Sequence, residues 1–312
     1  MRCIILLTVI FVSPLATMAE ELVMASRSLL HNTVRLVTQK PMAQTCVGTG
    51  FFYTFHDQKK GRDIPVIVTC RHVIEGSVRC RLFLALGSTN SSARTQNHFF
   101  VDLPEFQESW IRHPDSSVDL AVMPLAPIIR LLRSQGKELD VMSITPEQLP
   151  SEDDMKGCGV FQEVKFIGYP IGMWDEKNNL PIVRRGMTAT DPSVDYNGKP
   201  EFLIDAAVYP GSSGSPVFVA YDGMGVFAGK LTAGPRVLLL GVLYGVHQFS
   251  AEGTINIVTI PTAFDAKTRS LIPANLGIVT KASRLQEFMS VFDKIAQMQE
   301  KMMKNPGGPM KP

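Results

Sequence analysis

Short apolar segments separated by turn residues run through most of this chain and restrict the folds that it can adopt. Many short strands at regular spacing, without long helical patterns between them, are typical of β-sandwiches and β-barrels. The sequence therefore predicts an all-β protein. The predicted strands are residues 33–38, 50–55, 66–70, 79–85, 120–123, 164–168, 202–204, 217–220, 237–246 and 255–260.

The composition fits a protein that buries one or two substantial cores. The chain has 312 residues, of which 45% are hydrophobic, and this is enough to form cores of that size. Its 31 basic residues nearly balance its 29 acidic residues, and no dense basic block occurs. The charge pattern therefore argues against a nucleic-acid-binding or membrane-surface role.

The segment PGSSGSP at residues 210–216 predicts a tight turn that presents a serine hydroxyl. Gly211 and Gly214 allow backbone conformations that are closed to most residues. The N–H groups of Gly211 and Ser213 would then converge on one point, as acyl transfer requires for the developing oxyanion. Turns rich in Gly and Ser also simply connect strands, so this segment alone does not define a function.

Two other segments supply chemical partners for the serine. The apolar run VTCRHVI at residues 68–74 contains His72, and SVDLAV at residues 117–122 places Asp119 just before another apolar run. A serine hydroxyl becomes a nucleophile when an imidazole takes its proton, and a carboxylate orients that imidazole. The chain supplies these groups in the order His, Asp, Ser.

The three segments resemble the chymotrypsin-fold, trypsin-like serine peptidases, and more narrowly their HtrA-like bacterial branch. The similarity runs through residues 69–73, 119–122 and 205–216. Residues 48–51 resemble the early Gly-x-Gly strand of the family, and residues 168–172 resemble its Gly-x-Pro-x-Gly turn. The resemblance implies two antiparallel six-stranded β-barrels with the catalytic cleft between them, followed by a C-terminal α-helix.

The resemblance also implies a role for each site residue. His72 is the general base and then the acid, Asp119 orients it, Ser213 is the nucleophile, and the N–H groups of Gly211 and Ser213 form the oxyanion hole. The implied activity is that of an exported serine endopeptidase, which hydrolyses polypeptides through an acyl-enzyme and needs neither a metal nor an organic cofactor.

The serine turn departs from the family's usual Gly-(Asp or Asn)-Ser-Gly-Gly-Pro pattern. Ser212 stands where digestive members carry a carboxylate that captures a newly cut N-terminus, so that activation route is closed. Ser215 replaces the second glycine, and it is the alternative nucleophile if the register shifts by two. Asp102 and Asp115 are alternative carboxylates, although only Asp119 directly precedes an apolar strand.

Two other functions remain open at this point. The first is a catalytically silent binding or scaffold protein of the same fold, with an oxyanion loop distorted at Ser212 and Ser215. The second is an esterase. The α/β-hydrolase motif Gly-x-Ser-x-Gly is not matched, because the second residue after Ser213 is a serine.

By resemblance, five uncharged residues line the first specificity pocket. A small apolar pocket predicts cleavage after an uncharged, small or medium aliphatic residue. The five residues are Ala207, Val208, Tyr244, Gly245 and Val246.

The expected chain organisation has six parts and leaves no room for the PDZ domain that many HtrA-like enzymes carry. The parts are a signal peptide (1–19), an N-terminal barrel with the His and Asp (28–125), an inter-barrel linker (126–157), a C-terminal barrel with the Ser and oxyanion hole (158–280), a helix (283–303) and a disordered tail (304–312).

The N-terminus has the pattern of a secretory leader. Arg2 precedes the apolar run 4–12, residues 17–19 offer a cleavage site, and Pro14 interrupts a run that is too short to span a membrane. We therefore expect export to a bacterial periplasm or the extracellular space, without stable membrane insertion once the leader is removed. An uncleaved anchor is the alternative.

Four cysteines remain after removal of the leader, and an even number in an exported protein permits disulfides. By resemblance, Cys46 and Cys70 flank strands that meet near the active site, and they are the preferred pair. Four buried free thiols, with Cys80 and Cys158 as the other two, are the alternative.

A stripe of apolar residues near the C-terminus predicts an amphipathic helix. We expect this helix to pack against the second barrel; a contact with a protein partner or a second copy of the chain is the alternative. The apolar positions are 285, 288, 291, 292, 295 and 298.

Overall fold

The computed structural model describes residues 28–87, 98–104, 106–227, 230–255 and 266–304. The expected leader, residues 305–312 of the expected tail and residues 256–260 of the last predicted strand lie outside the described residues. No helix in the described ranges is long and apolar enough to cross a membrane.

The N-terminal half forms one antiparallel sheet of eight strands. Its hydrogen-bonded order is β5-β4-β1-β2-β3-β7-β6, and β8 pairs with β4. Strand β4 illustrates why these segments form strands, since its sequence RCRLFLALG alternates exposed with buried residues at the period of two that a strand requires. The strands are β1 (Thr33–Gln39), β2 (Thr45–Asp57), β3 (Arg62–Thr69), β4 (Arg79–Gly87), β5 (His98–Pro104), β6 (Ile111–Arg112), β7 (Ala121–Pro124) and β8 (Glu138–Leu139).

The C-terminal half forms a closed barrel of six strands in the order β10-β11-β16-β15-β12-β9. A separate hairpin pairs β13 (Gly225–Phe227) with β14 (Lys230–Thr232). The barrel strands are β9 (Glu163–Gly168), β10 (Ile182–Thr188), β11 (Glu201–Asp205), β12 (Ser215–Tyr221), β15 (Arg236–Ile255) and β16 (Ala266–Lys281).

The expectation of a mostly β protein with a closed six-stranded barrel and a C-terminal helix is confirmed. The N-terminal sheet differs from the expected barrel, because in the described part of the chain its strand path runs from β5 to β6 without closing. The boundaries of the six expected parts remain predictions.

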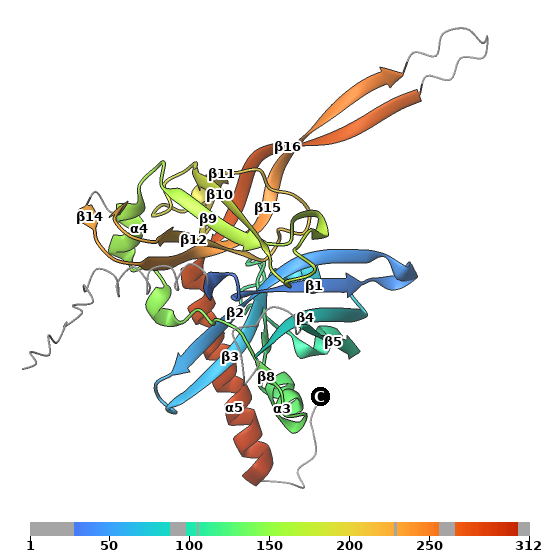
Figure 1. Ribbon diagram of the computed structural model, residues 1–312, viewed down its shortest axis with the longest axis vertical. Helices are drawn as coiled ribbons and strands as arrows, with labels where there is room; N and C mark the ends of the chain where they lie inside the picture. Colours follow the sequence, from blue (N-terminus) through green and yellow to red (C-terminus); the bar gives the residue numbers. More distant parts are fainter. Residues whose placement is uncertain (1–27, 88–97, 105, 228–229, 256–265, 305–312) are drawn as a thin grey trace, which may run out of the picture.

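Strands β15 and β16 continue beyond the barrel as a two-stranded ribbon that projects from the molecule (Figure 1). Strand β12 pairs with β15 only as far as Ser215 opposite Leu243. Strand β11 pairs with β16 only as far as Asp205 opposite Leu276. Beyond these points the two long strands pair only with each other, as far as Ile255.

The helices are short, apart from the C-terminal one. The expected linker contains α3, β8, η3 and α4, and α4 begins at a capping box in which Ser151 and Asp154 exchange hydrogen bonds. The helices are α2 (Arg71–Ile74), α3 (Ala126–Ser134), α4 (Glu152–Cys158) and α5 (Phe288–Lys304), with 3₁₀ turns η1 (Pro41–Ala43), η2 (Phe106–Ser109), η3 (Pro146–Gln148), η4 (Pro170–Gly172), η5 (Tyr196–Gly198) and η6 (Ala282–Glu287).

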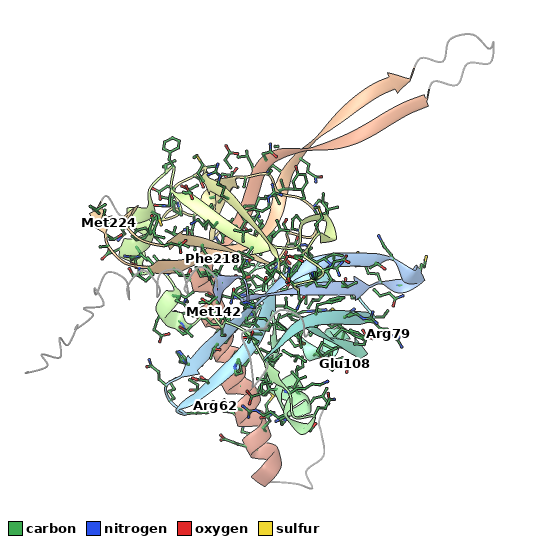
Figure 2. All side chains as sticks on the ribbon, in the orientation of Figure 1. Arg62, Arg79, Glu108, Met142, Phe218 and Met224 are labelled. Atoms are coloured by element: carbon green, nitrogen blue, oxygen red, sulfur yellow. The ribbon has the colours of Figure 1, made fainter. Side chains whose placement is uncertain are left out.

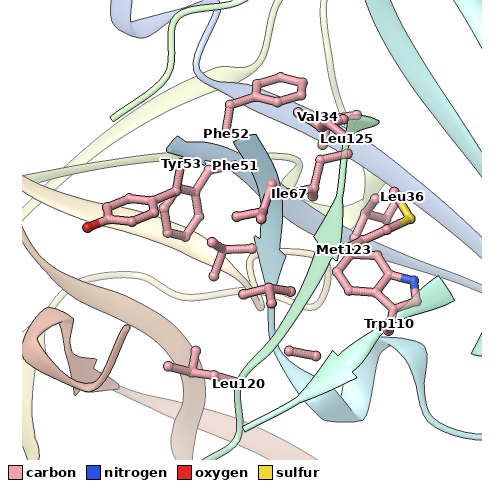
Figure 3. Close-up of a cluster of buried hydrophobic side chains, with 14 of the residues drawn as sticks. Val34, Leu36, Phe51, Phe52, Tyr53, Ile67, Trp110, Leu120, Met123 and Leu125 are labelled. Carbon is pink, nitrogen blue, oxygen red and sulfur yellow. The ribbon is translucent and has the colours of Figure 1, made fainter. Parts of the chain in front are cut away.

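Two apolar cores lie beneath these sheets. The larger one fills the N-terminal sheet and extends to barrel residues such as Phe218 and Leu239; the smaller one fills the barrel. Large aromatic and aliphatic side chains of β1, β2, β3 and β7 interlock in the larger core (Figure 3). Because this core includes residues of both halves, it fixes the N-terminal sheet against the barrel.

The predicted C-terminal helix meets the barrel at its start, where η6 contacts β15, and its main part α5 packs against the N-terminal sheet instead of the expected second barrel. Phe55 of β2 lies 6.4 Å from the ring centre of Phe288 and 5.2 Å from that of Phe292. Leu285 is fully buried beside them, whereas Met298 is exposed. The predicted apolar stripe is present, and it packs on Phe55 of β2.

The four cysteines at positions 46, 70, 80 and 158 are all free, so the preferred Cys46–Cys70 disulfide is not formed. The buried thiol of Cys70 instead donates a hydrogen bond of 3.5 Å to the carbonyl of Leu243 in the barrel.

Candidate active site

The antiparallel pairing of β3 with β7 brings His72 and Asp119 together. The register places Thr69, the last residue of β3, opposite Ala121, the first residue of β7. The histidine follows β3 in the one-turn helix α2, and the aspartate lies just before β7. Two residues distant in sequence therefore meet at the same end of neighbouring strands.

Asp119 holds His72 through both of its carboxylate oxygens. Nδ1 of His72 lies 2.5 Å from Oδ2 of Asp119, and the backbone N–H of His72 donates to Oδ1 at 3.0 Å. In the neutral ring, a proton on Nδ1 that is donated to a carboxylate leaves Nε2 as the basic nitrogen. The side chain of His72 is 46% exposed, so Nε2 is available to a reacting group.

The other two carboxylates considered from the sequence have different partners. Asp102 forms a bidentate pair with Arg81, at 2.8 and 2.9 Å. Asp115 pairs with Arg284 at 2.7 Å. Asp119 is thus the carboxylate that orients His72.

The predicted tight turn between β11 and β12 is present, and two glycines enable it. Gly211 has φ +92° and Gly214 has φ +90°, a region that residues with a Cβ rarely adopt. A Cβ on Gly214 would also lie 1.9 Å from the carbonyl oxygen of Thr49. The turn therefore fits against the N-terminal sheet only because glycine stands there.

The hydrogen bonds of this turn leave two particular N–H groups without an acceptor. The N–H of Ser212 donates to the carbonyl of Tyr209 at 3.0 Å, and that of Gly214 donates to Leu243 at 2.7 Å. Among the described residues, the N–H groups of Gly211 and Ser213 donate to nothing. These are the two donors that the sequence assigned to an oxyanion hole.

The hydroxyl of Ser213 points to the barrel rather than to the histidine. Its Oγ lies 3.4 Å from the carbonyl oxygen of Tyr244, and no hydrogen bond joins it to His72 in the described structure. The backbone carbonyl of Ser213 accepts from the N–H of Thr49 at 2.9 Å. The structure therefore pairs His72 with Asp119 and packs the serine turn beside the sheet that carries them, but it leaves the serine side chain unpaired with the imidazole.

Thr49 is a site residue that sequence reasoning missed. Its hydroxyl donates to the carbonyl of Gly211 at 2.8 Å and accepts from the N–H of Tyr169 at 3.1 Å. The carbonyl of Thr49 accepts from the hydroxyl of Thr69 at 2.7 Å. The signal was its place between two glycines in the Gly-x-Gly strand, but no sequence pattern reveals which turn its hydroxyl meets.

The five predicted pocket residues flank the serine turn on two sides. Ala207 and Val208 follow β11, and Tyr244, Gly245 and Val246 follow the residue of β15 that pairs with Ser215. Val208 is buried in the barrel core, and Ala207 and the three residues of β15 are half-buried. We refer to these five residues, none of which carries a charge, as the uncharged wall.

Glu201 adds a carboxylate beside this wall that the sequence did not indicate. Its Oε1 accepts a hydrogen bond of 2.9 Å from the hydroxyl of Tyr244. Burial, reinforced by Glu201, raises the pKa of the Tyr244 phenol. The phenol therefore stays protonated and fixes the orientation of this side chain.

Three neighbouring side chains offer ligand atoms of the kinds that metals use. One ligand atom each from Cys70, His72 and Asp119 lies within 4.8 Å of the others. Burial raises the pKa of the Cys70 thiol, and the Asp119 charge adds to this effect. Two of the three ligand atoms, Nδ1 of His72 and Oδ2 of Asp119, are already bonded to each other.

Comparison with known proteins places this arrangement in a family. Residues 48–225 match the trypsin-like peptidase domain. The match spans more than half of the chain and contains His72, Asp119 and Ser213, and the chain belongs to this family. No curated protein matches the sequence.

Two solved structures are similar in part. One is Deg5, with 16% identity and a TM-score of 0.43, covering 75% of this chain and 88% of that chain. The other is the active form of the Rv3671c protease from M. tuberculosis, with 16% identity and a TM-score of 0.38, covering 88% of this chain and 84% of that chain.

Proposed function

We propose that this protein is an exported serine endopeptidase that hydrolyses peptide bonds through an acyl-enzyme. Ser213 attacks the peptide carbonyl while His72 takes the hydroxyl proton through Nε2. His72 then donates this proton to the leaving amine, and water releases the acyl group by the same route in reverse. Asp119 fixes the tautomer and stabilises the imidazolium.

The observation that carries this proposal is that two N–H donors without acceptors in the described structure lie in the turn beside the sheet that holds an oriented imidazole. The N–H groups of Gly211 and Ser213 lack acceptors among the described residues, whereas their neighbours Ser212 and Gly214 are bonded. Preorganised donors of this kind contribute about 10²–10³ in rate each. They lie in a turn that packs against the sheet holding His72 and Asp119.

Export, to a periplasm or beyond, belongs to the same proposal and depends on the leader-like residues 1–19. In this proposal the N-terminal sheet is the counterpart of the first of two barrels, and the substrate is a polypeptide. The N-terminal sequence of protein recovered from an exporting host checks this point. A start near residue 20 supports export, and an intact Met1 contradicts it.

The preferred residue before the cleaved bond is uncharged and of small or medium size, such as Ala or Val. The support is the uncharged wall formed by Ala207, Val208, Tyr244, Gly245 and Val246. Digestion of a peptide library checks it, and efficient cleavage only after Arg or Lys would contradict it.

A catalytically silent protein of the same fold is the second candidate, favoured by one specific observation. Ser213 Oγ is hydrogen-bonded to the carbonyl of Tyr244 rather than to His72. Rotation of the serine side chain during substrate binding removes this objection, because catalytic hydrogen bonds often form only in the substrate complex.

A fluorophosphonate probe decides between the two functions, because it reacts with an activated serine and not with an ordinary one. The label is mapped by mass spectrometry in the wild type, Ser213→Ala and His72→Ala. Label on Ser213 that is lost in both variants supports the peptidase. Absence of label from well-folded wild-type protein supports the silent fold.

A further inference from the structure

Three arginines form a strip on one face of the N-terminal sheet. The antiparallel register of β1 with β4 places Arg35 opposite Phe83, Val37 opposite Arg81, and Gln39 opposite Arg79. Directly paired residues, and residues two apart along a strand, share a face. The three arginines thus line one pocket of ≈ 340 Å³; Figure 2 labels one of them, Arg79, beside the N-terminal sheet.

The charges in this pocket are not balanced. Asp102 neutralises Arg81 through the bidentate pair described above, and the Arg81 hydrogen bond lowers the pKa of the Asp102 carboxyl. Among the described residues, neither Arg35 nor Arg79 forms an ion pair, although the charge of Asp102 also acts on Arg79 at longer range. The negative charge of Glu176 attracts Arg35 at a distance, without forming an ion pair with it in the described structure. The pocket therefore carries a surplus of about two positive charges.

Arg35 is held in place before any ligand arrives. Its guanidinium carbon lies 5.2 Å from the ring centre of Phe83 and 5.1 Å from that of Trp174, and these two rings meet edge to face. Its Nε is buried and has no hydrogen-bond partner in the described structure. Aromatic contacts fix the group without neutralising it, which lowers the entropic cost of binding an anion.

This pocket adjoins the serine turn through the 3₁₀ turn η4. A Cβ on Gly211 would lie 3.3 Å from the backbone nitrogen of Ile171 and 3.4 Å from that of Gly172. A Cβ on Gly172 would lie 3.5 Å from Nη2 of Arg35 and 3.5 Å from the side chain of Val47. One turn of backbone therefore separates the free N–H of Gly211 from the guanidinium of Arg35.

The pocket and the uncharged wall lie against different parts of the serine turn. Tyr244 contacts the hydroxyl of Ser213, whereas η4 contacts Gly211. In the proposed reaction the acyl part of the substrate lies on the side of Tyr244, which leaves the side of η4 and Arg35 for the segment released with the leaving amine.

We infer that the arginine pocket binds acidic side chains of the substrate segment that follows the cleaved bond. This inference rests on the proposed peptidase function and specifies its substrate class. Arginine and carboxylate form the strongest of the common charged hydrogen bonds, because the planar guanidinium matches both oxygens.

The test compares two peptides with the same acyl side. One carries Glu at the second to fourth positions after the cleaved bond, and the other carries Lys there. We expect kcat/KM to favour the Glu peptide by about tenfold or more, as one charged hydrogen bond supplies. The ratio should fall as salt is raised to about 0.5 M. An alkyl ester with the same acyl group, which has no following segment, serves as a substrate that cannot reach the pocket.

The variants Arg35→Gln and Arg79→Gln should bring the Glu-to-Lys ratio toward one, and the control Arg133→Gln on α3 should keep the wild-type ratio. Equal kcat/KM for both peptides in the wild type would overturn the inference, whether or not the variants fold. So would a ratio that neither pocket variant changes.

The ester separates this failure from failure of the proposed function. Cleavage of the ester and equal cleavage of both peptides means that only the charge preference is wrong. Cleavage of none of the three means that the peptidase proposal is wrong. Fluorescence anisotropy of the labelled peptides with Ser213→Ala then tests the pocket alone: tighter binding of the Glu peptide supports it, and equal binding contradicts it.

Discussion

Thr49 joins the N-terminal sheet to the serine turn, since its hydroxyl donates a hydrogen bond of 2.8 Å to the carbonyl of Gly211. Its backbone N–H also donates to the carbonyl of Ser213. One residue of β2 thus holds the carbonyl groups of both residues whose N–H groups are free. Because a peptide unit is planar, these two bonds fix the peptide planes that carry the N–H groups of Ser212 and Gly214, which flank the free donor of Ser213.

Replacement of this threonine should reduce both the activity and the stability of the protein. Thr49→Val keeps the shape of the side chain but leaves the carbonyl of Gly211 and the N–H of Tyr169 without partners, at about 1–3 kcal/mol for each group. We expect kcat/KM to fall about 10²-fold, because the serine turn that carries the oxyanion donors loses the bond that anchors it to β2. Urea unfolding and peptide hydrolysis measure the two effects separately.

The matched control is Thr54→Val, on the same strand. Thr54 Oγ1 pairs with Ser143 Oγ at 2.7 Å, away from the serine turn. This variant should lose some stability and keep its kcat/KM. Full activity of Thr49→Val would mean that the turn holds its conformation without the threonine.

The carboxylate at position 119 should matter far more than the one at position 115. Asp119→Asn replaces an acceptor with an amide that favours the wrong tautomer of His72, so kcat should fall about 10⁴-fold. Asp115→Asn weakens the contacts of this side chain with Arg284 and Ser117, none of which involves His72, and should retain kcat. Steady-state kinetics at neutral pH compares them, and a similar loss in both variants would argue against a specific role for Asp119.

The turn should tolerate no side chain at position 214. In Gly214→Ala the new methyl group meets the carbonyl oxygen of Thr49 at a backbone φ of +90°. We expect a loss of about 3 kcal/mol or more in the free energy of unfolding. Gly61→Ala, at φ +58° with nothing within 4 Å of the methyl, should lose only about 1 kcal/mol.

Urea titration of both glycine variants gives these free energies. Equal losses at the two positions would show that backbone strain, rather than the contact with Thr49, dominates the cost.

The free cysteines should differ sharply in reactivity. Burial raises the pKa of the Cys158 thiol to about 12, and it also raises the pKa values of Cys70 and Cys80. Cys46 is the one of the four that is not fully buried. In a Cys3→Ser background at pH 8, Ellman's reagent should therefore modify one thiol quickly, and all four after denaturation.

Adding Cys46→Ser should abolish the fast reaction, and reducing agent should leave the melting temperature unchanged. A melting temperature that drops with reductant would contradict four free thiols.

Much of the fold could be predicted from local sequence, because buried strands here are short apolar runs. The predicted strand at 33–38 is β1, Thr33–Gln39, and the predicted strand at 164–168 lies within β9, Glu163–Gly168. Strand β10 was not predicted, because its sequence IVRRGMT contains two arginines and a glycine and has only one fully buried position. The outer part of β16 is likewise polar, and its strand conformation comes from pairing with β15.

The candidate site also has a part that local sequence predicts and a part that it does not. The residue types at 72, 119 and 213 signal their chemistry because each stands at the end of an apolar run or in a glycine turn. The contacts of Thr49 and the arginine pocket depend on strand register and on how the two halves dock. These are properties of pairs of distant segments, which no local pattern encodes.

The path of the chain after β16 limits how far the N-terminal sheet and the barrel can move apart. Strand β16 belongs to the barrel, α5 packs with Phe288 and Phe292 in the core of the N-terminal sheet, and only the short turn η6 connects them. The C-terminal segment therefore ties the two halves together, and Phe288 and Phe292 would have to leave the core before the halves could separate. A bound polypeptide must be accommodated by side chains and loops at the rim, and the two halves should unfold in a single cooperative transition.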